Sequence, residues 1–484
     1  MSVCQNLEPK KVFGFFEELT KIPHCSYHEK QISDYLVNFA KKRNLEVIQD
    51  KALNVIIRKP GTKGYENKTP VIIQGHMDMV CEKTEDSKHD FSKDPLELRV
   101  VGDNLYATNT TLGADDGIAV AYALAILDSD NIPHPPLEVV VTTAEEVGMD
   151  GAMALDTSLL KGKIMLNVDS EEEGVLLTGC AGGINTRTIF SNDLISKSGK
   201  CIQLSVTGLL GGHSGIEIVK QRANANKLMG RLLFELKTSI EFNIVKINGG
   251  TKHNAIPREC IASITLKNDS DISKVNTIVK KMEEDFKSEY RVTDPGLTLK
   301  VSDCCCTDDD KEFTSKRTSE VIDFLVASPN GVQNMSEDIK GLVQTSLNIA
   351  VIDTTKDGIE ITISIRSSMK SLKYEVFNTL SVISKMLNAK LEKLTEYPEW
   401  EYDPNSKVRE LCLNVYKDLF NKDAEVSAIH AGLECGLFKE TMKDTDMISF
   451  GPSIYDAHTT NEHLCISSAE RMYKLLLEVL KEIN

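Results

Sequence analysis

Several marks of other protein classes are missing from this chain of 484 residues. No segment approaches about 18 consecutive apolar residues, which excludes a membrane-spanning helix, and the N-terminal MSVCQNLEPKKVFGFFEEL lacks the apolar core of a secretory signal. A basic surface is missing as well, because 72 acidic residues outweigh 56 basic ones and give a net charge of -16. Phosphate binding needs clustered Lys and Arg. We therefore expect a cytoplasmic protein whose partners are neither nucleic acid nor membrane.

The spacing of the cysteines is not that of a disulfide-rich or zinc-ribbon protein. The twelve cysteines, which include the run Cys304–Cys306, show neither even spacing nor repeated C-x-x-C pairs. At 41% apolar residues the chain is long enough for two or three domains with large cores. We therefore expect the cysteines to be reduced structural thiols.

Helix-like and strand-like patterns alternate over residues 30–186 and return near the C-terminus. The continuous apolar runs VIIQG, LEVVVTT and KIMLNV predict buried strands, whereas QISDYLVNFAKKRN and ADDGIAVAYALAILDS predict helices. Buried strands flanked by helices indicate a mainly parallel sheet covered by helices on both faces. Because AEVSAI, DMISF and SAERMYKLLLEVLKEI continue the pattern, residues 1–190 and 399–484 are predicted to form one α/β domain in two parts.

Residues 191–398 follow a different order. CIQLSVTG, a helix at 216–236, FNIVKING, CIASITLK, a helix at 271–288 and LTLKVSD give the order β-α-β-β-α-β. The order can be drawn again from LTLKVSD through a helix at 314–327, SLNIAVID, GIEITISIR, a helix at 371–388 and KLEKLTEY. The sequence therefore predicts an inserted α+β domain of two ferredoxin-like units.

Polar residues follow the predicted strands of the α/β domain at their carboxyl ends. They are His76 and Asp78 after VIIQG, Glu145 and Glu146 after LEVVVTT, Asp169 after KIMLNV and His458 after DMISF, with Asp115 at the start of a helix. Each has a simple structural explanation when taken alone, such as a helix N-cap for Asp115. In open α/β sheets, however, ligands bind beyond the carboxyl ends of the strands. Two His and several carboxylates at that edge suit zinc, manganese or cobalt.

The number of candidate ligands favours two metal ions over one. A single open catalytic zinc site does not use as many side chains as His76, Asp115, Glu146, Asp169 and His458. Two ions that share a carboxylate, about 3.5 to 4 Å apart, use them all. Asp78 would be able to accept the second imidazole N–H of His76, because the two residues lie on the same side of an extended chain.

These motifs resemble those of a known enzyme family. GHMDMV, GADDGIA, TTAEEVG, NVDSEE, GGHSG, HNAIP and DAHTTNE occur in the order found in the binuclear-zinc peptidase and amidohydrolase family, which includes carboxypeptidases, aminoacylases and peptidases T and V. GHMDMVCEK, TLGAD, EEVGMDGA and HAGLECG are similar to its histidine-dipeptidase branch. The resemblance runs from about residue 5 to the C-terminus. It implies a zinc-exopeptidase-like catalytic domain with an inserted lid domain.

The resemblance also implies a role for each position. The implied ligands are His76 and Asp169 for one metal ion, Glu146 and His458 for the other, and Asp115 between them. Glu145 would be the general base, and the ions would be zinc, with cobalt or manganese as alternatives. Many relatives have a Lys after the second Asp of GADDGIA, where this chain has Gly117. Asp116 is left out of the ligand set, because one bridging carboxylate is enough.

The predicted lid carries further candidates. By resemblance, His213 of GGHSG would stabilise the oxyanion, with Asn254 of HNAIP near the substrate, although both motifs are also typical of plain turns. Arg366 is a candidate for binding the substrate carboxylate, since a guanidinium binds a carboxylate bidentately. His430 and Glu434 of HAGLECG are candidates for the substrate pocket.

The predicted function is metal-dependent hydrolysis of small dipeptides, including Xaa-His dipeptides, with proton transfer by Glu145. Two alternatives stay open. An N-acyl-amino-acid deacylase would use the same metals without a pocket for a free amine. The second alternative is a non-catalytic metal-dependent binding protein. The presence of both Glu145 and Glu146 argues against this alternative. Monomer and homodimer stay open too, because a doubled lid could replace the dimer contact of single-lid relatives.

Overall fold

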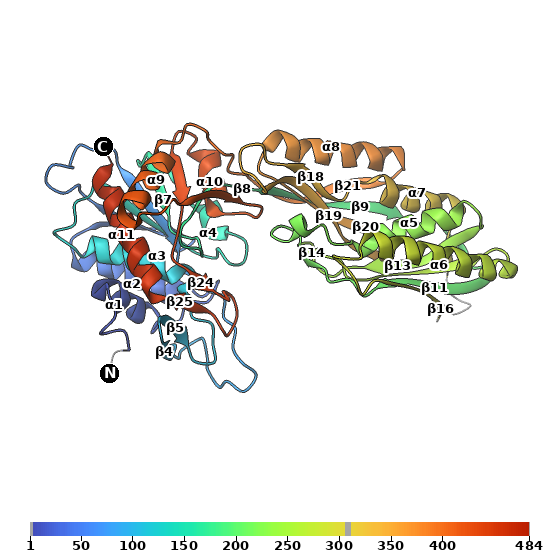
Figure 1. The fold of residues 1–484 in the computed structure, drawn as a ribbon, viewed down its shortest axis with the longest axis horizontal. Helices are drawn as coiled ribbons and strands as arrows, with labels where there is room; N and C mark the ends of the chain where they lie inside the picture. Colours follow the sequence, from blue (N-terminus) through green and yellow to red (C-terminus); the bar gives the residue numbers. More distant parts are fainter. Residues whose placement is uncertain (1–2, 305–310, 484) are drawn as a thin grey trace. The chain divides into compact units, whose positions relative to one another are not determined.

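The structure is a computed structural model that describes residues 3–304 and 311–483. The described residues form two compact units (Figure 1). Unit 1 consists of Met1–Gly179, Tyr402–Ala428 and Leu433–Asn484, and unit 2 of Cys180–Glu401 and Ile429–Gly432. Within the described residues, no helix is both long enough and apolar enough to cross a membrane.

A mixed sheet forms the centre of unit 1, with the strand order β1-β2-β6-β3-β7-β23-β8-β22. Its strands are β1 Glu46–Gln49, β2 Val55–Lys59, β3 Val71–His76, β6 Leu137–Thr142, β7 Ile164–Asn167, β8 Val175–Cys180, β22 Glu425–Ile429 and β23 Asp446–Ser449. Strands β6, β3, β7 and β23 are parallel, whereas β1, β2 and β8 pair antiparallel. Every residue of β3 and β6 is buried, as expected for apolar strands covered on both faces. The predicted α/β class is confirmed, with antiparallel strands added on both sides of the parallel centre.

Helices pack around this sheet. They are α1 Lys10–Leu19, α2 Lys30–Lys42, α3 Ala114–Leu127, α4 Asp150–Ala154, α9 Lys407–Phe420, α10 Glu434–Thr441 and α11 Ile466–Glu482. Val71 and Ile73 of β3 belong to the apolar core that contains α3. Because side chains alternate along a strand, Gln74 and His76 lie on the opposite face of the sheet. A small separate sheet has the order β24 Ile454–Tyr455, β25 His463–Cys465, β5 Asn104–Ala107 and β4 Leu98–Val101.

Unit 2 is a sheet with its helices on one face (Figure 1). The strand order is β16-β11-β15-β13-β19-β20-β9-β21, and β18 also pairs with β19. The strands are β9 Gly182–Ser191, β11 Lys200–Thr207, β13 Phe242–Gly249, β15 Cys260–Leu266, β16 Thr298–Asp303, β18 Gly331–Met335, β19 Val343–Thr355, β20 Gly358–Ser367 and β21 Lys390–Tyr397. The helices are α5 Ala225–Lys237, α6 Ile272–Glu289, α7 Ser315–Ala327 and α8 Lys370–Met386. Two short pairs complete it, β10 Leu194–Ser196 with β17 Lys311–Phe313, and β12 Gly212–His213 with β14 Ala255–Ile256.

The sheet of unit 2 contains two β-α-β-β-α-β units, but the second one does not begin where the sequence suggested. The first unit has the strand order β16-β11-β15-β13 and the second β21-β9-β20-β19, which is the same arrangement of first, second, third and fourth strands. The prediction that LTLKVSD (β16) starts the second unit is wrong. Strand β9, which pairs with β20 and β21, takes that place. The boundary predicted at residue 190 leaves nearly all of β9 in the first domain.

One predicted helix begins later than expected. Residues 216–224 do not form the start of a helix over 216–236; α5 begins at Ala225, where the side chain of Asn224 accepts the N–H of Lys227. The segment before it contains β12, which pairs antiparallel with the distant strand β14. Asn224 therefore caps the helix and fixes its start.

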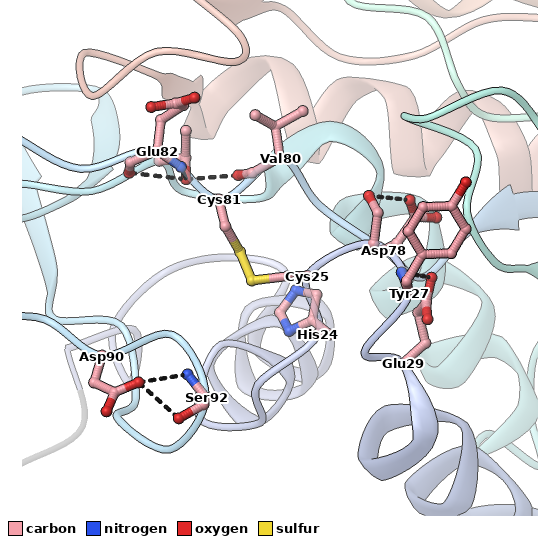
Figure 2. Close-up of a disulfide and its surroundings, with 12 residues drawn as sticks. His24, Cys25, Tyr27, Glu29, Asp78, Val80, Cys81, Glu82, Asp90 and Ser92 are labelled. Carbon is pink, nitrogen blue, oxygen red and sulfur yellow. Dashed lines mark hydrogen bonds between the residues drawn. A yellow bond between two sulfur atoms is a disulfide. The ribbon is translucent and has the colours of Figure 1, made fainter.

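A disulfide joins Cys25 and Cys81 (Figure 2). The expectation of reduced thiols is therefore wrong for this pair, whereas Cys260 and Cys412 are buried thiols as expected. The bond links the segment before α2 to the segment after β3. Residues 305–306 of the predicted cysteine run lie outside the described residues.

Candidate active site

Several candidate metal ligands lie at or just beyond the carboxyl ends of adjacent parallel strands. Strand β3 ends at His76, β6 ends shortly before Glu145 and Glu146, and β7 ends shortly before Asp169. Since the strand order is β6-β3-β7, these loops lie at one edge of the sheet. The parallel centre of the sheet therefore brings together side chains that are distant in the sequence.

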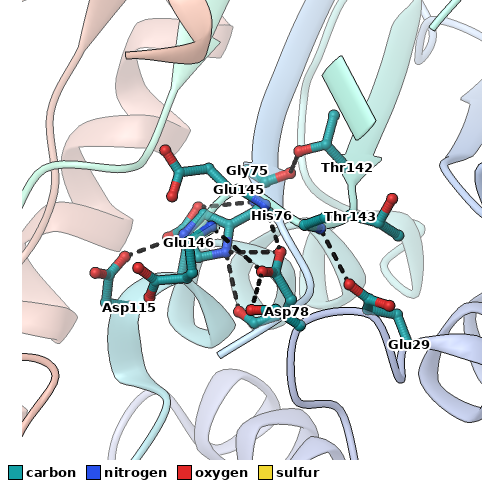
Figure 3. A network of polar contacts seen from close by, with 12 residues as sticks. Glu29, Gly75, His76, Asp78, Asp115, Thr142, Thr143, Glu145 and Glu146 are labelled. Carbon is teal, nitrogen blue, oxygen red and sulfur yellow. Dashed lines mark hydrogen bonds and ion pairs between the residues drawn. The ribbon is translucent and has the colours of Figure 1, made fainter. Parts of the chain in front are cut away.

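Asp115 lies between two imidazoles. Its Oδ1 is 3.2 Å from Nε2 of His76, and its Oδ2 is 3.0 Å from Nε2 of His458. Nε2 of His76 is also 3.6 Å from Oδ1 of Asp169, and Nε2 of His458 is 3.0 Å from Oε2 of Glu146. All five predicted ligands thus form one continuous chain of contacts, of which Figure 3 shows the part around His76, Asp115 and Glu146.

Donor atoms in this chain form overlapping groups that would be able to hold metal ions. Within each group the ligand atoms lie within 4.8 Å of one another. The groups are His76, Asp116 and Asp169; His76, Asp115 and Glu146; and Asp115, Glu171 and His458. Two residues were missed or set aside by sequence analysis. The sequence prediction leaves Asp116 out of the ligand set and does not single out Glu171, an exposed residue whose carboxylate lies near Asp115 and His458.

The electrostatics of the cluster favour added positive charge. Burial opposes a charged His76, but hydrogen bonds with Asp115 and Asp169 outweigh it and raise the pKa of His76 well above its usual value. Hydrogen bonds with Asp115 and Glu146 raise the pKa of His458 to about 11. Among the described residues, buried Oε1 of Glu146 has no hydrogen-bond partner. A nitrogen and oxygen donor set with a spare buried oxygen fits divalent cations.

Asp78 fixes both His76 and the loop that carries the glutamates (Figure 3). Its Oδ1 accepts the N–H of Glu145 at 3.0 Å, and its Oδ2 accepts the N–H of Glu146 at 3.3 Å and the hydroxyl of Ser26 at 2.8 Å. Nδ1 of His76 lies 3.0 Å from the backbone oxygen of Asp78. Burial opposes ionisation, but the hydrogen bond with His76 and the N–H donors lower the pKa of Asp78. The aspartate is therefore a carboxylate that orients its neighbours.

The two adjacent glutamates differ in their surroundings. The carboxylate of Glu146 contacts His458, whereas the side chain of Glu145 extends in another direction (Figure 3). Burial raises the pKa of Glu145 well above its usual value. Ala144, which precedes the pair, has φ 52° and donates its N–H to Oε1 of Glu29. This left-handed turn lets neighbouring side chains take separate positions.

Glu462 was also missed. Its carboxylate, 3% exposed, accepts the N–H groups of residues 112, 113 and 114 at 2.7, 3.1 and 2.8 Å. These residues directly precede Asp115, and Glu462 follows His458 closely in the sequence. One carboxylate therefore joins the two segments that carry these candidate ligands. The only sequence signal was an acidic residue within the DAHTTNE motif.

The predicted substrate residues His213 and Asn254 lie together in unit 2. Both line a cavity of about 1040 Å³ beside the paired strands β12 and β14. The backbone oxygen of Asn254 accepts the N–H of Ser214 at 2.8 Å. Burial, and then the charge of Arg366, lowers the pKa of His213. His213 is therefore held as a neutral imidazole.

Arg366 is buried in unit 2 next to histidines. It is 7% exposed and donates to the hydroxyl of Tyr397 at 2.8 Å. Its buried Nε has no hydrogen-bond partner among the described residues. Burial and the charge of Arg366 lower the pKa of His430 to about 3, and Nε2 of His430 lies 2.7 Å from the hydroxyl of Ser346. The guanidinium of Arg366 is therefore a buried cation with an unused N–H donor, and such a group is suited to binding an anion.

His430 and Glu434, the two substrate-pocket candidates of HAGLECG, are assigned to different units. His430 belongs to unit 2, whereas Glu434 is the first residue of α10 in unit 1. The side chain of Glu434 is fully buried and accepts hydrogen bonds from Gln74 and Thr142. Burial raises the pKa of Glu434 to about 7.

Comparisons with known proteins agree with this geometry. The model of peptidase family M20/M25/M40 matches residues 72–482. The cytosol non-specific dipeptidase of Escherichia coli strain K12 is 41% identical over 485 residues, which cover 100% of this chain and 99% of that protein. The structure of aminoacylhistidine dipeptidase from Vibrio alginolyticus matches with a TM-score of 0.92 and 37% identity, covering 99% of this chain and 98% of that one. Aminopeptidase PepT from Bacillus cereus, at 14% identity and a TM-score of 0.58 over 99% of both chains, shares the fold.

Proposed function

The chain belongs to peptidase family M20/M25/M40 and is a peptide hydrolase, and from this premise we propose that it is a metal-dependent dipeptidase. One observation carries the proposal. The carboxylate of Asp115 directs one oxygen to His76 and the other to His458, at 3.2 and 3.0 Å. A carboxylate shared in this way is the natural bridging ligand of a two-metal site.

We assign five residues to the metals. His76 and Asp169 would hold one divalent ion, Glu146 and His458 the other, and Asp115 both. When bound, such ions lower the pKa of water and polarise the peptide carbonyl. Zinc is the proposed metal, with cobalt and manganese as alternatives, because imidazole and carboxylate donors suit all three.

Glu145 is the proposed general base. It is buried next to the ligand chain, and its raised pKa fits a group that accepts a proton and gives it up again near neutral pH. In this role it takes the proton of the attacking water and passes it to the leaving amine. Asp78 supports the step by holding the N–H of Glu145 and the imidazole of His76.

Unit 2 is proposed to be the lid. His213, held neutral, would donate a hydrogen bond to the oxyanion, with Asn254 beside it. Arg366 would bind the substrate's free carboxylate through the donors that Tyr397 leaves unused. His430 would contribute to the same carboxylate-binding region.

The proposed substrates are unblocked dipeptides, including Xaa-His dipeptides. The Vibrio relative is named for aminoacylhistidine, and the E. coli relative is named a non-specific dipeptidase of the cytosol. We therefore place the protein in the cytoplasm and expect a broad preference among dipeptides. Because disulfides are rare in that compartment, the redox state of Cys25 and Cys81 in cells tests this location directly.

A panel of dipeptides with added zinc, manganese or cobalt tests the function. Hydrolysis of dipeptides, with histidine-containing members included, is the expected result. Each dipeptide should be paired with its N-acetylated form, since a deacylase would prefer the acetylated one. Metal binding without hydrolysis of either form would instead indicate a binding protein.

Glu145→Gln tests the assignment of the base. The variant should bind both metal ions as the wild type does, while kcat falls by about 100-fold or more. Glu146→Gln is the matched control on the neighbouring residue, and it should lose metal affinity. Equal turnover of Glu145→Gln and wild type would refute the role.

A further inference from the structure

A buried carboxylate lies beneath the candidate metal site without belonging to it. Glu434 is 0% exposed and is absent from the candidate metal groups of the described residues. Its Oε2 accepts Nε2–H of Gln74 at 2.5 Å and the hydroxyl of Thr142 at 2.8 Å. The proposed chemistry uses none of these three side chains. A buried ionisable group with no assigned task therefore sits next to the ligand-bearing strands.

The partners of Glu434 occupy equivalent positions on adjacent strands. Gln74 lies two residues before His76 in β3, so both side chains point to the same face of the sheet. Thr142 is the last residue of β6 and is paired in register with His76. Glu434 thus connects the ends of two strands directly below a candidate ligand.

The network extends to a third strand. Oε1 of Gln74 accepts Nδ2–H of Asn167 at 2.6 Å. Asn167 is paired with Gln74 in the parallel register and lies two residues before Asp169. Gln74, Thr142 and Asn167 are all at most 1% exposed. The network of Asn167, Gln74, Thr142 and Glu434 therefore spans the three strands that lead to His76, Asp169 and the glutamate loop.

We propose that Glu434 is a positioning residue that sets the spacing of the metal ligands by holding the ends of β3, β6 and β7 through Gln74 and Thr142. The inference rests on the proposed function for its catalytic consequence. Its physical basis is the cost of a buried donor without a partner. Without the carboxylate, Gln74 and Thr142 must turn to find new acceptors, and their strands carry His76 and the glutamate loop. Partners that orient metal ligands typically contribute about 10- to 100-fold in metal affinity or activity.

The test compares Glu434→Ala and Glu434→Gln. The alanine variant should lower metal affinity and kcat by about 10- to 100-fold and leave KM nearly unchanged, because no substrate contact is removed. The glutamine variant retains an oxygen that can accept from both donors, so it should restore most of both properties. Zinc and manganese affinities are measured by calorimetry, and turnover with a dipeptide.

Glu138→Ala is the matched control. Glu138 is also a buried carboxylate and lies on the same face of β6 as Thr142. It accepts the N–H groups of Lys161 and Gly162 and pairs with Arg58, and it has no contact with the candidate ligands among these bonds. This variant should lose stability without a matching loss of metal affinity. An equal loss of affinity in both alanine variants would overturn the proposal, as would wild-type affinity and kcat in Glu434→Ala.

Thr142→Val covers the case in which Glu434→Ala does not fold. The change keeps the shape of the side chain and removes one donor to Glu434. It should weaken metal binding by several fold, and an unchanged affinity would overturn the proposal. Wild-type protein that binds metal but hydrolyses no dipeptide would refute the proposed function, while the series of metal affinities would still decide the role of Glu434.

Discussion

The Cys25–Cys81 disulfide offers a quantitative prediction about unit 1. Cys81 lies three residues after Asp78, and Ser26, which donates to Asp78, follows Cys25. The bond therefore holds two segments that meet at the carboxylate orienting His76 (Figure 2). We expect the Cys25→Ser, Cys81→Ser double variant to destabilise unit 1 and to leave unit 2 unchanged.

The magnitude follows from the loop that the bond closes. The two cysteines are separated by 56 residues in the sequence. Closing such a loop in the unfolded chain removes about 14 cal/mol/K of entropy, which is about 4 kcal/mol at 25 °C. The free energy of unfolding of unit 1 should fall by about this amount.

The single tryptophan separates the two units in the assay. Trp400 is 3% exposed and belongs to unit 2, so its fluorescence in urea follows that unit. Far-UV circular dichroism follows the unfolding of both units. The transition seen by circular dichroism but not by Trp400 fluorescence is therefore assigned to unit 1. Metal-free protein is used throughout, because ligands that bind the folded state add to apparent stability.

Reductant provides the control. Dithiothreitol should shift the unit 1 transition of the wild type to that of the double variant and should not move the variant. A variant that unfolds with the oxidised wild type would refute the loop-closure reasoning. A shift of the Trp400 transition would show that the effect is not confined to unit 1.

Two further predictions concern the site and its acid stability. Gly75→Ala would place a Cβ 2.3 Å from Oδ2 of Asp116, which accepts the N–H of His76. Metal affinity should therefore fall, and the free energy of unfolding should drop by about 1 to 3 kcal/mol. In the control Gly14→Ala the new Cβ meets nothing within 4 Å, so metal titration should show no loss of affinity and stability should be unchanged. His430, whose pKa is lowered to about 3 from 6.5, contributes stability that is fully present above pH 6.5 and is lost as the pH falls toward 3, since only the unfolded chain takes up the proton. Trp400 fluorescence in urea at pH 7 and pH 5 measures this loss, which His430→Gln should remove.

Local patterns predicted the elements, whereas distant pairings were missed. The helix expected at 271–288 is α6, Ile272–Glu289, because its apolar periodicity is carried within the segment. Strand β9 was misplaced because its partners β20 and β21 lie far along the chain. The same limit hid the Cys25–Cys81 bond. Propensity and periodicity predict the secondary structure of a segment, but they do not predict which distant segment it pairs with.

The site shows the same division. Ligands that end buried strands, such as His76 and Asp169, stand out because a polar residue there interrupts an apolar pattern, and the structure brings them together. Glu171 and Glu462 do not stand out, since an acidic residue in a polar loop resembles ordinary surface. Their roles depend on contacts with residues distant in the sequence, such as the bonds of Glu462 to the N–H groups of residues 112–114. Composition alone carries no signal for that.

The divided construction of unit 1 has a consequence for synthesis on the ribosome. Strand β7 needs β23 as its parallel neighbour, and Asp115 needs His458, yet the whole of Cys180–Glu401 is translated between them. At a translation rate of roughly 5 to 20 residues per second, some tens of seconds pass between the synthesis of β7 and that of β23. During this time the edge of β7 has no strand paired with it on that side. Unit 2, nearly continuous in sequence, can fold during that interval. The cluster of ligands is completed only when the last segment emerges, so metal loading should be a late, post-translational step.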